Sequence, residues 1–146
     1  MMAGMTVIVK TISRLLFPFI LLFGVYVLIH GHLTPGGGFQ GGVIIAASAV
    51  MLLLAYGMGE APIEIKFPRV EVMEVLGGLV LASVGLVGLV VGVGKFFGHV
   101  LPLGTIGELF SGGDLPLLNI GTSIKVTAGL ILIFYAMLRT MGGDGK

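Results

Sequence analysis

Four long apolar runs alternate with short segments that carry most of the charged residues, glycines and prolines. Each run can cross a hydrocarbon core of about 30 Å, for which a helix needs about 20 residues. The pattern predicts four transmembrane helices, over residues 6–31, 39–58, 74–97 and 116–139. We therefore expect an all-α integral membrane protein with a single four-span domain over residues 1–146.

The composition agrees with a membrane protein and argues against several classes of function. Hydrophobic residues make up 56% of the chain and charged residues 10%, with a mean hydropathy of +1.14. With no cysteine, the chain has no disulfide, thiolate ligand or iron–sulfur site. The net charge of +1 comes without a basic stripe, so no nucleic-acid partner is expected. The sequence has no Ser/His/Asp arrangement, metal cluster or inward carboxylate pair from which an enzyme active site could be built.

The basic residues predict an orientation. Lys95 lies in a loop on one side of the predicted membrane and Lys125 lies within the fourth run, whereas the other six lie toward the opposite side. These six are Lys10, Arg14, Lys66, Arg69, Arg139 and Lys146. The positive-inside rule then predicts that both termini and the 59–74 loop are cytoplasmic, while the 30–42 and 95–116 loops face outward.

The first apolar run follows Lys10 and Arg14, as the apolar part of a secretory signal follows its basic residues. No small-residue cleavage site follows this run; His30 to Pro35 comes instead. We expect a retained anchor, and hence a multi-pass protein of the cell membrane whose surroundings are the lipid bilayer.

A glycine-rich stretch separates the first two runs. Its residues 36–41 match the dinucleotide-binding pattern GxGxxG, but membrane spans flank it where that motif needs a strand and a soluble helix. Proline disfavours helix, and glycine reaches positive φ angles. The stretch is therefore predicted to be either an interfacial turn or a buried break packed against neighbouring subunits. Its members are Pro35, Gly36, Gly37, Gly38, Phe39, Gly41 and Gly42.

Two histidines, His30 and His32, come just before this stretch. A zinc site needs at least three protein ligands, and the third histidine, His99, is distant in sequence. No metal site is expected from this pattern. A membrane interface or a subunit contact is the simpler interpretation of both histidines.

The third run contains a stripe of small residues that includes the GxxxG pair Gly88 and Gly92. Small residues let membrane helices approach closely. The stripe predicts either packing between helices of this chain or a subunit interface, and the sequence leaves both open. Its other members are Gly77, Gly78, Ala82 and Gly85.

Lys125 lies nine residues into the fourth apolar run. A charge at such depth costs at least about 2.5–3.5 kcal/mol, so it should face protein or water and be paired or neutral. Thr122 and Gly129 share its helical arc, with Asn119 at the margin. Lys125 either contributes to a cation path, as a relay or a gate, together with His30, His32, Asn119 and Thr122, or pairs with a carboxylate of another chain, or snorkels outward.

The carboxylates of this chain are predicted to lie in or beside the loops, with none in the middle of a span. The predicted cytoplasmic connector contains two prolines and has Glu60, Glu64, Glu71 and Glu74 in or beside it, and the outer loop contains Glu108 and Asp114. This connector is expected to be a solvated loop or an ordered segment along a neighbour. The chain alone then lacks the groups for a complete ion path.

A family resemblance appears at the glycine-rich stretch. Pro35-Gly-Gly-Gly-Phe39 with Gly41-Gly42, after His32, resembles the signature of the MnhB/MrpB family, which are subunits of the Mrp-type multisubunit sodium/proton antiporters. The segment Leu101-Pro-Leu-Gly-Thr105, continuing through Gly112-Gly-Asp114 into Asn119-Ile-Gly121, resembles the loop before that family's last helix. The resemblance covers essentially the whole chain.

This resemblance implies an accessory, non-catalytic membrane subunit of a sodium/proton antiporter module. The implied partners are other membrane subunits, the implied cargo is Na⁺ and H⁺, and no cofactor is implied for this chain. Such subunits also occur in membrane-bound hydrogenase complexes, which are redox-driven. Two alternatives remain: a small autonomous homo-oligomeric transporter or channel, and a packing subunit without ion contact.

Overall fold

The computed structural model describes residues 5–33, 36–57, 60–63, 65–93, 96–97, 100–105 and 111–142. Its elements are α1 (Val7–Ile29), α2 (Gly38–Tyr56), α3 (Phe67–Gly88), a short π-helix (Leu89–Val93) and α4 (Leu115–Gly142). No strand occurs in these ranges. Four helices are long and apolar enough to cross a membrane, which confirms the predicted all-α class with four apolar helices.

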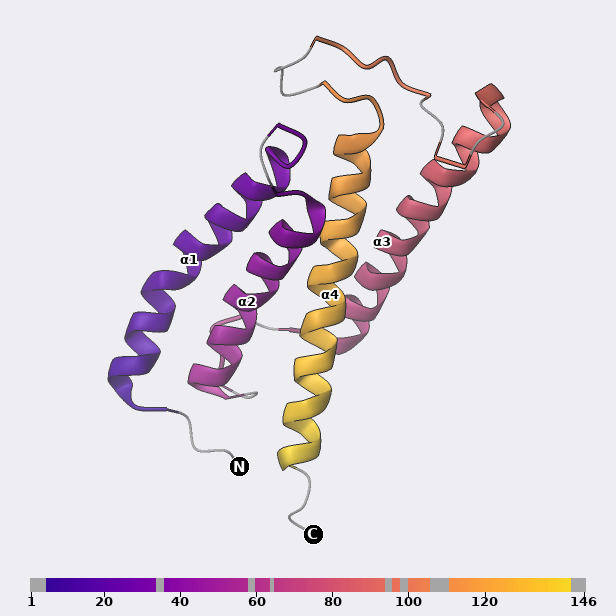
Figure 1. Ribbon diagram of the computed structural model, residues 1–146. Helices are drawn as coiled ribbons and strands as arrows, with labels where there is room; N and C mark the ends of the chain where they lie inside the picture. The colour runs from indigo at the N-terminus through magenta and orange to yellow at the C-terminus, as the bar shows by residue number, and fades with distance from the viewer. Residues whose placement is uncertain are drawn as a thin grey trace.

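The four helices form an open row in the order α1, α2, α4, α3 (Figure 1). Neighbours in this row pack closely, whereas α1 touches α4 only slightly. As a result α2 is more than half buried and the other three helices expose most of their surface. Such an open layer of apolar helices suits a membrane, where lipid tails or other subunits cover the apolar faces.

α3 begins at Phe67, seven residues before the predicted start of the third span. Pro68 lies in the first turn of the helix, where its missing N–H is no loss and its fixed φ angle favours helix. The Phe67 ring packs 5.0 Å from the ring of Tyr135 and fixes this end of α3 against α4. The second half of the predicted connector, up to Glu74, is therefore helical, and the interpretation of this half as a solvated loop is wrong.

The end of the third span also differs from the prediction. The α-helical part stops at Gly88, and a π-helix continues to Val93 instead of an α-helix to residue 97. Glycine weakens a helix, and Gly88 and Gly92 both lie at this change of geometry. Phe96 then folds back so that its ring covers Gly85 of α3.

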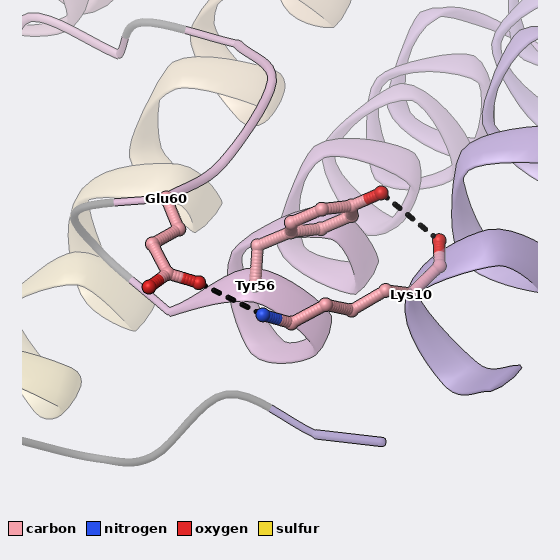
Figure 2. Close-up of polar contacts among 3 residues, drawn as sticks. All are labelled: Lys10, Tyr56 and Glu60. Carbon is pink, nitrogen blue, oxygen red and sulfur yellow. Dashed lines mark hydrogen bonds and ion pairs between the residues drawn. The ribbon is translucent and has the colours of Figure 1, made fainter. Parts of the chain in front are cut away.

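A polar cluster joins the start of α1 to the end of α2 (Figure 2). The Lys10 ammonium binds the Glu60 carboxylate at 2.8 Å and lies 5.4 Å from the centre of the Tyr56 ring. The Tyr56 hydroxyl donates a hydrogen bond to the Lys10 carbonyl at 3.2 Å. The hydrogen bond and the positive charge of Lys10 lower the pKa of Glu60 from its ordinary value of 4.5. Lys10 thus reaches the membrane edge and finds a counter-ion there.

We expect the Glu60 pKa, read from its carboxyl ¹³C shift in bicelles, to lie below 4.5 and to return toward 4.5 in Lys10→Met. A lowered pKa means that the contact stabilises the fold above pH 4.5 and loses its contribution as the pH falls through the Glu60 pKa. Arg14→Met, one turn further along α1, is the matched control and should leave the Glu60 value unchanged. An unshifted pKa in the unsubstituted protein would contradict the contact.

Candidate functional site

Lys125 has an ion-pair partner within this chain. Its ammonium lies 3.5 Å from Oε1 of Glu74, with the two side chains 46% and 38% exposed. Lys125 is ten residues beyond the start of α4, about 15 Å along the helix axis, and Glu74 is seven residues into α3, about 10 Å. Two predictions are therefore wrong: a carboxylate does lie within a span, and the counter-ion need not come from another chain. The early start of α3 is the reason.

Glycines bring α3 and α4 close enough for this pair. A methyl group on Gly77 would lie 2.7 Å from the Lys125 backbone nitrogen and 2.9 Å from the Gly121 carbonyl oxygen, so only glycine fits there. Gly121 of α4 in turn packs against Val80. At Gly77 the small-residue stripe therefore serves packing within the chain.

The glycine-rich stretch forms the start of α2 and packs against α4. Gly37 has a φ angle of +125°, which side chains other than glycine rarely adopt. The Gly38 N–H donates to Oδ1 of Asn119 at 3.2 Å, which satisfies one of the unpaired donors at this helix end. A methyl group on Gly38 would overlap the Asn119 backbone. Asn119 is thus a helix-capping and packing residue of this chain.

The next two glycines let α2 lie between two helices. A methyl group on Gly41 would lie 3.0 Å from Leu28 of α1, and one on Gly42 would lie 2.8 Å from the Ser123 carbonyl oxygen of α4. The Thr127 hydroxyl also donates to the Gly42 carbonyl at 3.0 Å. These contacts show that the glycine-rich stretch allows α2 to pack closely against α1 and α4 of the same chain. Of its other members, Gly36 is half-buried, Phe39 is exposed, and Pro35 lies outside the described residues.

Asn119 and Lys125, both predicted to line an ion path, do not come together. Asn119 faces α2, whereas Lys125 faces α3, because six residues turn a helix by about 600°, which leaves the two about 120° apart. Thr122 lies between these two residues in sequence, and its side chain is half-buried. His30 lies at the end of α1, where its ring stacks on Tyr26 at 4.3 Å.

His32 follows α1 and lies close to the loop before α4. Both of its ring nitrogens are buried without a hydrogen-bond partner in the described part of the chain, and its ring approaches Gly112. Asp114, just before α4, accepts the backbone N–H groups of Val100 and Leu101 at 3.0 and 3.3 Å. Within the described ranges no three His, Asp or Glu side chains gather as metal ligands would.

A cavity of about 520 Å³ lies where α1, α2 and α4 meet. Its lining is apolar apart from Ser13, with Val9, Ala46, Val50, Leu130 and Phe134 among its walls. A cation needs several oxygen ligands. This apolar cavity therefore lacks the ligands for an ion. Within the described spans, the Lys125–Glu74 ion pair is the stronger candidate for a functional site, because both of its groups are ionisable.

The chain is similar to known membrane proteins. A model of the domain related to the MnhB subunit of Na⁺/H⁺ antiporter matches residues 8–132. The chain belongs to the MnhB family. As a family member with four apolar helices, it is a multi-pass membrane protein.

Relatives of this MnhB family member come from archaea and bacteria. It is 34% identical over 130 residues to the uncharacterized protein MJ1307 of Methanocaldococcus jannaschii, covering 86% of this chain and 49% of that protein. It is 49% identical over 51 residues to a Na⁺/H⁺ antiporter subunit of Bacillus subtilis, covering 35% of this chain and 36% of that protein.

A solved structure extends the likeness to nearly the whole fold. One chain of the membrane-bound sulfane sulfur reductase, an archaeal respiratory membrane complex, matches with a TM-score of 0.77 and 40% identity. The match covers 94% of this chain and 60% of that chain. In all three comparisons this MnhB family member spans less than two thirds of its relative's length.

Proposed function

We propose that this chain is an accessory membrane subunit of an Mrp-type Na⁺/H⁺ antiporter module, and that the module belongs to a respiratory membrane complex. The observation that carries the proposal is the match at 40% identity and a TM-score of 0.77 to a chain of such a complex, within a family described by an antiporter subunit. The open row of helices supports it, because three helices leave most of their surface for other subunits or lipid.

In this proposal the subunit is non-catalytic and holds neighbouring membrane subunits in place. Lys125 is retained as the candidate for contact with a cation path, because it and Glu74 place two ionisable groups at bilayer depth. Asn119 is not retained, since its side chain caps α2. The module, rather than this chain, moves Na⁺ and H⁺.

We further propose that both termini face the cytoplasm. The start of α1, the start of α3 and the end of α4 lie at one end of the row (Figure 1). Lys10, Arg69 and Arg139 belong to these helix ends. The positive-inside rule assigns such an end to the cytoplasm.

The proposal predicts that the tagged chain, extracted from native membranes in mild detergent, co-purifies with several other multi-span membrane proteins. Mass spectrometry of the purified particle would identify them. Expressed alone in vesicles, the chain should give no sodium flux above empty vesicles. A solitary particle, or sodium transport by the lone chain, would overturn the accessory role and favour the autonomous transporter.

A further inference from the structure

The ion pair between Lys125 and Glu74 lies open on the outer face of α3 and α4. Gly78 and Gly129 flank it: a methyl group on Gly78 would lie 3.5 Å from the lysine ammonium, and one on Gly129 would lie 4.0 Å from the glutamate oxygen. Because neither residue has a side chain, nothing on these two helices covers the charged groups from outside. Their half-exposure is the result.

Exposed apolar side chains lie along both helices near the pair. Val75 of α3 follows Glu74 in sequence and is 60% exposed, and Ile133 of α4 lies about two turns beyond Lys125 and is 63% exposed. An ion pair in such surroundings would meet lipid tails if nothing else lay against it, and ionised groups are costly there. This face therefore requires a polar cover, and small residues allow a helix to approach closely enough to provide one.

The pair leaves hydrogen-bonding capacity unused. An ammonium has three donors and a carboxylate about four acceptor positions, while a single contact of 3.5 Å joins the two groups. The pair is neutral overall, so a third charged group would leave a net charge at bilayer depth. A neutral side chain that both donates and accepts hydrogen bonds satisfies both groups without that cost.

We infer that the α3–α4 face centred on Lys125 and Glu74 docks a transmembrane helix of another subunit, which presents an uncharged hydrogen-bonding side chain to the pair. Asparagine, glutamine, serine, threonine and histidine have this chemistry. The inference rests on the proposed function, because it needs a complex in which a second membrane subunit is present. It assigns Lys125 and Glu74 a role in subunit recognition.

Cross-linking of the intact complex tests this docking face. The chain has no cysteine, so single cysteines can carry a photo-cross-linker without background. Ala82, about two turns beyond Glu74 on α3, and Ala136, about three turns beyond Lys125 on α4, are both exposed and suit this purpose. We expect both to cross-link to an apolar segment of another subunit that contains one of the five residue types above. Cross-links to lipid alone, or to a second copy of this chain, would overturn the inference.

Charge variants test the neutral character of the partner. The swapped variant Lys125→Glu with Glu74→Lys keeps a neutral pair and should assemble as the unsubstituted protein does, whereas a charged partner would reject it. The apolar variant Lys125→Met with Glu74→Leu should bind the complex about tenfold more weakly, as expected for the loss of one or two interhelical hydrogen bonds. Undiminished assembly of the apolar variant would contradict the inference.

The outcomes separate this inference from the proposed function. If the unsubstituted chain co-purifies with other subunits and the Ala82 and Ala136 probes reach none of them, the docking face is wrong and the accessory role stands. If the chain co-purifies with nothing, both fail. The cross-linking arm uses the native ion pair, so it gives a result even where a swapped pair does not fold.

Discussion

Glu74→Gln is expected to destabilise the membrane-embedded protein by about 2.5–3.5 kcal/mol, the cost of an uncompensated charge at the centre of a helix in a bilayer. The substitution keeps the shape of the side chain but leaves the Lys125 ammonium without its counter-ion. Lys125→Met has the converse effect on the Glu74 carboxylate. Unfolding of the purified, bicelle-embedded complex by SDS titration measures both.

The double variant Lys125→Met with Glu74→Leu distinguishes an ion-pair effect from a packing effect. Replacing both charges by apolar groups removes the uncompensated charge, so about half of the lost stability should return, while the loss of the hydrogen bonds to the docked helix remains. A double-mutant cycle then gives the coupling between the two residues. Lys10→Met with Glu60→Gln is the control at the membrane edge, where Glu60 is exposed and little change is expected. Additive losses at Lys125 and Glu74 would refute the pair.

The second large effect is expected at the start of α2. Gly38→Ala should destabilise the protein by about 1–3 kcal/mol or more, because the added methyl group overlaps the Asn119 backbone and forces α2 away from α4. Asn119→Ala removes only the hydrogen bond to the Gly38 N–H and should cost about 1 kcal/mol. The same SDS titration measures both variants.

Gly129→Ala is the matched control for Gly38→Ala. It also adds one methyl group to a helical glycine, but its nearest neighbour there is 4.0 Å away, an ordinary contact distance. Both glycine variants are compared in the chain expressed alone, where no other subunit lies against Gly129. There Gly129→Ala should be neutral or slightly stabilising, since alanine favours helix over glycine. Equal losses at Gly38 and Gly129 would show that the close approach of α2 and α4 is not the cause.

The hydrophobic pattern predicted the class of fold well, because the length of an apolar run is directly coupled to the thickness of the bilayer. It placed the start of the third helix wrongly, since the first two turns of α3, Phe67–Glu74, carry three charged residues and so do not look like a membrane span. Pro68 was the local signal for an early start. That error in turn hid the partner of Lys125.

The candidate site was only partly visible in the sequence. The depth of Lys125 identified it as an unusual residue, but the direction in which each side chain of α4 points depends on the neighbouring helices. Asn119 and Lys125 therefore seemed to share a strip and instead face different helices. The sequence marked the glycine-rich stretch as unusual. The reason that glycines are needed there is the close approach of α2 to its neighbours at three positions, which only the three-dimensional structure shows.

The row of helices divides into two hairpins, α1 with α2 and α3 with α4, each made of consecutive segments that pack on one another. The main seam between them lies between α2 and α4, and Gly38 and Gly42 lie along it. Each hairpin can therefore enter the bilayer and form by local contacts, and the seam closes afterwards. Bulky substitutions at these two glycines should separate the halves of the molecule while leaving each hairpin inserted and helical.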